Sequence, residues 1–272
     1  MLRAENSFFL LSTKESRALI ACFFAADVCL AAAYLFLFLY GNPIGNDQPG
    51  MFDLGGEGNV PAWYSATKLF VVALCIYFYG RFVVLRDKVA GLLILAGALL
   101  FVFLSLDEGG QLHERFGDRL TRVAAGGREE TAFEVTGLWM MFFGPPLFLA
   151  LVGSIVFLRR RLAIPYGIFA KALAGAVIFV TAAAPGDILV NYLSGNALVV
   201  QTGVEEFGEM VGVTLILWAT MTLLARQQPV VLGKVSPAQE RATEWASPAQ
   251  HRPVLGGGVA APAAAQAHRQ SS

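Results

Sequence analysis

The chain has 272 residues, of which 56% are hydrophobic and 15% charged, and its formal net charge is zero. Because ordinary soluble domains carry about a quarter charged residues, this composition excludes a typical water-soluble protein and requires lipid around the surplus apolar surface. The three cysteines lie in apolar runs without CxxC spacing, which argues against a disulfide framework or a thiolate metal site.

Six apolar runs follow one another along the chain, each of about the length that a helix needs to cross a bilayer. We therefore predict an all-α, polytopic membrane bundle of about six transmembrane helices within residues 1–226. Residues 227–272 are rich in Ala, Pro, Gln and Gly without apolar periodicity, which predicts a disordered cytoplasmic tail. The runs cover residues 18–40, 64–85, 89–106, 133–158, 166–193 and 206–224.

Two proline sites interrupt these runs. Pro145 and Pro146 lie in the middle of the fourth run, where their missing backbone donors predict a bend. Pro185 and Gly186 lie in the fifth run, so its last turns are expected to form a separate short helix. Bends of this kind often line cavities, but they are also common packing features of membrane helices.

The basic residues predict the orientation. Fourteen of the 20 Lys and Arg fall on the side of the N-terminus when the six runs are threaded through a membrane, and four fall on the other side. This bias predicts that both termini are cytoplasmic. We expect a multi-pass protein of the bacterial cytoplasmic (inner) membrane that contacts lipid and binds no nucleic acid. Fourteen of the 20 acidic residues fall on the outer, periplasmic side, and this excess has no role in setting orientation.

The first acidic string, residues 105–118, lies at the outer end of the third run. If the helix continues through the string, its acidic residues line one polar face and three arginines form a stripe beside it. If Gly109-Gly110 breaks the helix instead, His113 becomes able to turn toward the carboxylates. The polar face would contain Asp107, Gln111, Glu114 and Asp118, and the arginine stripe Arg115, Arg119 and Arg122.

A second acidic string opens the sixth run from the same side. Glu205, Glu206 and Glu209 stack like charges at helical spacing, in what we expect to be the first turns of a membrane helix. The helix dipole favours such charges by about 1 kcal/mol at most, whereas ionised carboxylates at membrane depth cost several times that. These carboxylates therefore need a cation or a proton.

The leading hypothesis is an outward-facing divalent-metal site between the third and sixth spans. Oxygen ligands with one imidazole suit Fe, Mn, Zn or Ca. If the metal is catalytic, the protein is a membrane metalloenzyme in which a metal-bound water attacks the substrate. No catalytic residue is assigned, because HExxH and paired Glu-x-x-His motifs are absent from the sequence. The candidate ligands are Asp107, Glu108, His113, Glu114, Glu205, Glu206 and Glu209.

Two alternatives stay open. The first is a cation- or proton-coupled transporter, whose polar path would use Asp27, Lys68, Asp187, Asn191 and Glu209, with the proline bend as a gate. The alternative, in which these two residues have no function in transport, is that Lys68 reaches outward to the interface and Asp27 is protonated or bonded to nearby backbone. The second alternative is a non-catalytic assembly or structural subunit, in which the arginine stripe neutralises the carboxylates.

Overall fold

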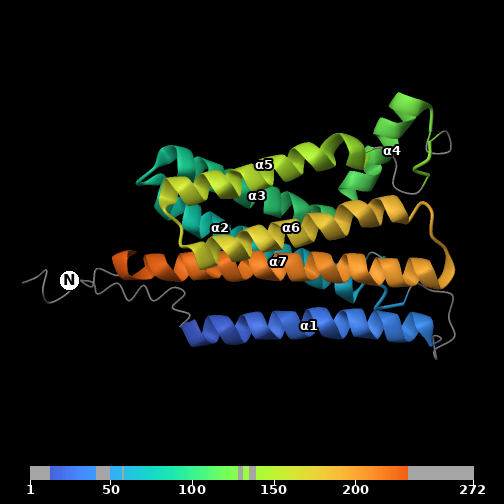
Figure 1. Ribbon diagram of the computed structural model, residues 1–272, viewed down its shortest axis with the longest axis horizontal. Helices are drawn as coiled ribbons and strands as arrows, with labels where there is room; N and C mark the ends of the chain where they lie inside the picture. Colours follow the sequence, from blue (N-terminus) through green and yellow to red (C-terminus); the bar gives the residue numbers. More distant parts are fainter. Residues whose placement is uncertain (1–12, 41–49, 57, 128–130, 135–138, 232–272) are drawn as a thin grey trace, which may run out of the picture. The chain divides into compact units, whose positions relative to one another are not determined.

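The computed structural model describes residues 13–40, 50–56, 58–127, 131–134 and 139–231, whose arrangement is drawn in Figure 1. These residues form seven α-helices and no β-strand, so the predicted all-α class is confirmed. The predicted tail lies outside the described residues from position 232 onward. The helices are α1 (Thr13–Leu39), α2 (Val60–Val84), α3 (Lys88–Gly110), α4 (Leu112–Ala125), α5 (Trp139–Leu162), α6 (Tyr166–Leu189) and α7 (Gly195–Val231).

Several of the helices have the length and composition of membrane spans. Over the described residues, five are long and apolar enough to cross a bilayer, namely α1, α2, α3, α6 and α7. The chain is therefore a membrane protein with several spanning helices. The helix α5 occupies the position of the fourth predicted span but is not one of these five, so a sixth span stays a prediction.

Polar side chains set the ends of the helices around the site. Asn59 accepts a hydrogen bond from the N–H of Ala62 (3.0 Å) and caps α2, and Asp87 accepts one from Ala90 (3.1 Å) and caps α3. Gln111 adopts a left-handed φ of 51°. Because a left-handed residue cannot continue a helix, α3 ends there and α4 starts in a new direction.

The long helix α7 is the centre of the packing. It contacts α1, α2 and α6, while α2 and α3 form a closely packed hairpin. Gly175 of α6 and Gly212 of α7 approach so closely that a Cβ on either would lie 2.6 or 2.8 Å from the other's carbonyl oxygen. Small residues permit this close contact between membrane helices. The fully buried Val72 of α2 and Leu217 of α7 lie in the core between the helices.

Two expectations about helix ends are wrong. The helix α6 is continuous through Pro185 to Leu189, so no separate short helix follows the proline. Membrane helices tolerate proline where a neighbouring helix covers the freed backbone, and Gly208 of α7 packs against Ala182 at this level. The helix α7 begins at Gly195, well before the predicted start at residue 206. Gly195 has a left-handed φ of 59°, and no proline interrupts the chain from there to residue 206.

The long start of α7 changes the setting of the second acidic string. Glu205, Glu206 and Glu209 lie inside the helix rather than in its first turn, so the helix dipole contributes little to them because its effect is confined to the end turns. The helix α5 is also continuous through Pro145 and Pro146. The bend expected at those prolines stays a prediction.

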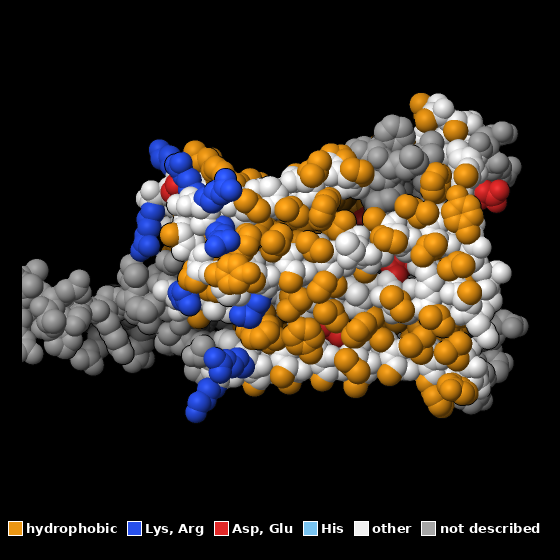
Figure 2. All heavy atoms as spheres, in the orientation of Figure 1, with side chains coloured by type: hydrophobic (Ala, Val, Ile, Leu, Met, Phe, Trp, Pro, Cys, Tyr) orange, Lys and Arg blue, Asp and Glu red, His pale blue; other side chains and the backbone are white. Residues whose placement is uncertain are grey.

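Charges divide between the two ends of the helices. Figure 2 shows Lys and Arg gathered at one end. Arg17 lies near the start of α1, Arg81 near the end of α2, Lys88 at the start of α3 and Arg161 near the end of α5. This grouping agrees with the alternation in the sequence, and the assignment of this end to the cytoplasm stays a prediction.

Candidate functional site

A buried ion pair joins α1 to α2. Lys68 Nζ lies 2.7 Å from Asp27 Oδ1, and the two side chains are 1% and 0% exposed. Lys68 also donates a hydrogen bond to the backbone carbonyl of Met210 on α7, at 2.8 Å. The lysine is therefore held inside the bundle, and the expectation that it reaches outward to the interface is wrong.

Two hydroxyl groups complete the surroundings of the Asp27 carboxylate. Tyr64 donates to Oδ1 at 2.6 Å and Thr214 donates to Oδ2 at 2.7 Å. Tyr64 precedes Lys68 by one helical turn on α2, so both side chains lie on one face of that helix. The Lys68 ammonium also lies 4.6 Å from the centre of the Tyr64 ring, within cation–π range. Three helices, α1, α2 and α7, thus meet at one carboxylate.

The hydrogen bonds around Asp27 stabilise the fold only while both Asp27 and its donors are present. A carboxylate accepts hydrogen bonds and cannot donate them, and every partner of Asp27 described above is a donor. Removing one member of a buried pair leaves an uncompensated charge, which costs about 3–5 kcal/mol. We therefore expect Asp27 and Lys68 to hold α1, α2 and α7 in a fixed relation while both charges are present.

A group of carboxylates lies beside this pair. Glu206 and Glu209 of α7 interact electrostatically with acidic side chains of α3, α6 and their own helix. Within the described residues, the charged groups that act on these two glutamates are all acidic. We call this group the carboxylate cluster, and its members are Glu108 of α3, Asp187 of α6, and Glu205, Glu206 and Glu209 of α7.

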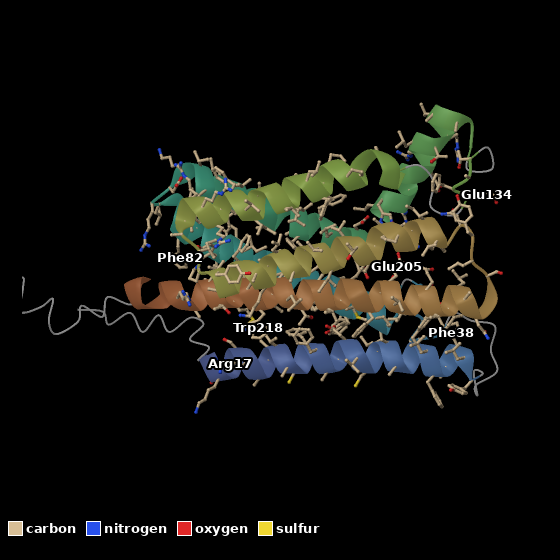
Figure 3. All side chains as sticks on the ribbon, in the orientation of Figure 1. Arg17, Phe38, Phe82, Glu134, Glu205 and Trp218 are labelled. Atoms are coloured by element: carbon tan, nitrogen blue, oxygen red, sulfur yellow. The ribbon has the colours of Figure 1, made fainter. Side chains whose placement is uncertain are left out.

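Glu205 is held at the contact between α6 and α7, and Figure 3 shows it on the side of α7 that faces α6. Gln201 donates a hydrogen bond from Nε2 to Glu205 Oε2 at 2.6 Å. A Cβ on Gly186 would collide with the Glu205 carboxylate, so the glycine of α6 makes the space that this side chain fills. The second amide atom, Gln201 Oε1, is buried and has no hydrogen-bond partner among the described residues.

Lys68 connects the carboxylate cluster to the buried ion pair. Its ammonium is hydrogen-bonded to Asp27 and interacts electrostatically with Glu108. Glu108 in turn acts on both Glu206 and Glu209. Lys68 therefore interacts with one member of each group, Asp27 and Glu108.

Asp107 and His113 form a separate pair at the end of α3. Asp107 accepts the backbone N–H of His113 at 2.7 Å, and its second oxygen lies 2.8 Å from His113 Nδ1. The pair forms because the chain turns at Gln111. Of the two alternatives for this string, the structure has the break, directly after Gly109-Gly110, and not the single polar face continuing into α4. The same turn gives α4 a new direction, and the arginine stripe is not among the groups that act on Glu205, Glu206 or Glu209.

The predicted metal ligands are brought together only in part. Glu108, Glu205, Glu206 and Glu209 belong to one cluster, whereas Asp107 pairs with His113. Glu114 lies in α4, and its side chain is outside the described residues. In the part of the chain that the structure describes, no three His, Cys, Asp or Glu side chains converge as metal ligands.

Asp187 and Asn191 of the proposed polar path lie at the end of α6. Asp187 acts on Glu205, Glu206 and Glu209, so it joins the cluster. Asn191 Nδ2 donates hydrogen bonds to the backbone carbonyls of Asp187 (2.8 Å) and Ile188 (3.3 Å). These bonds close the last turn of α6.

Sequence reasoning missed Tyr64, Thr214, Gln201 and Asp53. The sequence does contain a signal for the first three, because each is a polar residue one helical turn from a residue of the site. Tyr64 lies one turn before Lys68, Thr214 one turn after Met210, and Gln201 one turn before Glu205. Asp53 lies in the loop before α2 and acts electrostatically on Glu206. Burial raises the pKa of Asp53, and the backbone N–H of Gly55 (3.1 Å) opposes the rise. No sequence spacing indicated that this loop approaches α7.

The helices and their buried charges define a polytopic α-helical membrane protein with ionisable side chains inside the bundle. The model of one family, described as "Domain of unknown function (DUF8692)", matches residues 20–225. The chain belongs to this family. No curated protein and no solved structure matches it.

Proposed function

We propose that this protein is a proton-coupled membrane transporter whose proton-binding groups are Glu206 and Glu209. The observation that carries the proposal is the position of these two glutamates among further carboxylates, next to the Asp27–Lys68 pair. We place the protein in the bacterial inner membrane, with the carboxylate cluster toward the periplasm, because the basic residues gather at the other end.

Electrostatic repulsion within the carboxylate cluster favours the binding of protons. Carboxylates that share a site of low dielectric constant repel one another, and each also loses its solvation, so they cannot all be ionised together. A proton relieves the repulsion and requires no fixed ligand geometry. This fits a cluster in which carboxylates are near one another without three of them, in the described residues, converging on one point.

Proton binding at the cluster is coupled to the packing of the helices through Lys68. When Glu206 and Glu209 lose protons, the negative charge near Glu108 increases and competes with Asp27 for the Lys68 ammonium. A shift of Lys68 toward Glu108 would break its bond to Asp27 and weaken the link between α1, α2 and α7. Proton binding would then favour one arrangement of the spans over another, as coupling requires.

A divalent-metal site in the same region is the second candidate, and the Asp107–His113 pair favours it. Metal-binding histidines commonly donate a hydrogen bond from one ring nitrogen to a carboxylate, which fixes the ring so that the other nitrogen binds the metal. Here Nδ1 lies against Asp107, so Nε2 would be the ligand atom. Carboxylates of the cluster would have to move toward His113 to supply oxygen ligands, because no three such side chains converge in the described residues, and Fe, Mn, Zn or Ca would suit this set.

Infrared spectroscopy of the full chain in lipid nanodiscs tests the proton sites. Protonated carboxyl groups have a C=O band that ionised ones lack, so we expect a band that titrates with pH and decreases in Glu206→Gln and Glu209→Gln. The matched control is Glu134→Gln, because Glu134 is an exposed glutamate outside the cluster. A band unchanged in the Glu206→Gln, Glu209→Gln double variant would refute the proton sites.

Transport itself is tested in liposomes that contain a pH-sensitive dye. Under an imposed membrane potential, we expect faster internal pH change with the wild type than with protein-free liposomes, and loss of the difference in Glu209→Gln. A rate equal to that of protein-free liposomes refutes proton movement. Bound metal that chelators remove, that stabilises the protein in a concentration-dependent way and that His113→Ala abolishes would establish the second candidate instead.

A further inference from the structure

The helix α4 differs from the long helices because its apolar and charged residues are segregated. Leu112, Phe116 and Val123 recur at the spacing of one helical face, and they are 39%, 52% and 87% exposed. The opposite side carries Gly117 and Thr121, which are buried, and Thr121 is 0% exposed. The helix contacts α3 and α5. One side of α4 is therefore buried, whereas much of the surface of Leu112, Phe116 and Val123 is exposed.

Three arginines border this apolar face. Arg115, Arg119 and Arg122 follow one another at i, i+4 and i+7, and all three are exposed. Projected around a regular helix, Arg119 falls directly beside Leu112, and Arg115 and Arg122 fall just beyond it. The exposed surface of α4 is thus an apolar stripe with a positively charged border.

The position of α4 puts this surface at the edge of the bilayer. The helix α3 has the length of a membrane span and ends at Gly110. Gln111 then turns the chain, so α4 starts at the end of α3 (Figure 1). If α3 spans the bilayer, α4 starts at the edge of the hydrocarbon. At this depth an apolar stripe can enter the acyl region while guanidinium groups reach the headgroups.

We propose that α4 is an interfacial helix that binds anionic lipid headgroups through Arg115, Arg119 and Arg122. A guanidinium group donates paired hydrogen bonds that match the oxygens of a phosphate, so arginine suits phospholipid headgroups better than a simple point charge does. Binding to headgroups would account for the position of three of the four basic residues on this side of the predicted topology, which lie on one helix. The proposal is independent of the proton sites on α7.

Hydrogen exchange of the full chain in nanodiscs tests this binding. We expect the amides of residues 112–125 to exchange more slowly as phosphatidylglycerol replaces phosphatidylcholine, by up to about fivefold for each arginine. High salt should reduce the difference, because screening weakens attraction between exposed charges. The triple variant Arg115→Gln, Arg119→Gln, Arg122→Gln should lose the lipid dependence, while the corresponding triple Lys variant should keep most of it.

A control separates this helix from general attraction of basic residues to the membrane. Lys14→Gln with Arg17→Gln removes two exposed charges at the start of α1 and should leave the lipid dependence of residues 112–125 unchanged. Equal exchange in the two lipids, or a lipid dependence that survives in the triple Gln variant, would overturn the proposal. Protection that depends on protein concentration rather than on lipid charge would also overturn it, since it would mean that a second copy covers α4.

Discussion

Replacing Lys68 by Met or Asp27 by Asn tests whether the buried pair holds the bundle together. The lysine makes two hydrogen bonds, to Asp27 Oδ1 and to the carbonyl of Met210, at 2.7 and 2.8 Å. Hydrogen bonds to charged groups contribute about 1.5–3 kcal/mol each. Loss of both, with a negative charge left in a site that is 0% exposed, predicts a destabilisation of about 3–5 kcal/mol for Lys68→Met.

The double variant provides the sharper measurement. If the two charges stabilise each other, Asp27→Asn should also cost about 3 kcal/mol, and the double variant should cost less than the sum by about 2–3 kcal/mol. The free energy of unfolding is measured in mixed micelles by titration with a denaturing detergent. Lys14→Met is the control, because Lys14 is exposed at the start of α1, and it should change stability by about 0.5 kcal/mol or less. Additive single changes would refute the reasoning.

Three further predictions concern the helices around the site. Thr214→Val removes a hydroxyl that bonds the buried carboxylate and should cost about 1 kcal/mol in unfolding free energy, whereas Thr222→Val, whose hydroxyl bonds its own helix, should cost less. Gly186→Ala forces a Cβ into a carboxylate of α7 and should lower the free energy of unfolding by about 1–3 kcal/mol. In the control Gly167→Ala the new Cβ meets no atom within 4 Å, so this change should be neutral or stabilising. Equal effects of the two changes on unfolding would contradict the packing. Arg161 donates a hydrogen bond to Asp87 at 2.6 Å and so lowers the pKa of Asp87. The stability from this pair is therefore present above the ordinary Asp pKa of about 4 and is lost as pH falls through the lowered value. Asp87→Asn keeps the helix cap and should flatten the acid side of the melting-temperature profile.

The sequence by itself determined the class of protein and much of the helix order. Apolar runs of sufficient length require lipid and an α-helical backbone whatever their partners are, and the structure has a long helix at each predicted run. Asp27 and Lys68 were recognisable as functional candidates from their depth in apolar runs alone, because ionisable side chains there need a partner. The identity of that partner was not in the local sequence, since 41 positions separate the two residues.

Tertiary structure decided which polar groups meet. Lys68 bonds Asp27 instead of reaching the interface because α1, α2 and α7 pack around it. Glu205 fits against α6 because Gly186 leaves room, and such a space depends on the register between two helices. The left-handed Gln111 turns the arginine stripe away from the carboxylates and pairs Asp107 with His113. Residue spacing defines the faces of a single helix, but the contacts between faces of different helices follow from their packing.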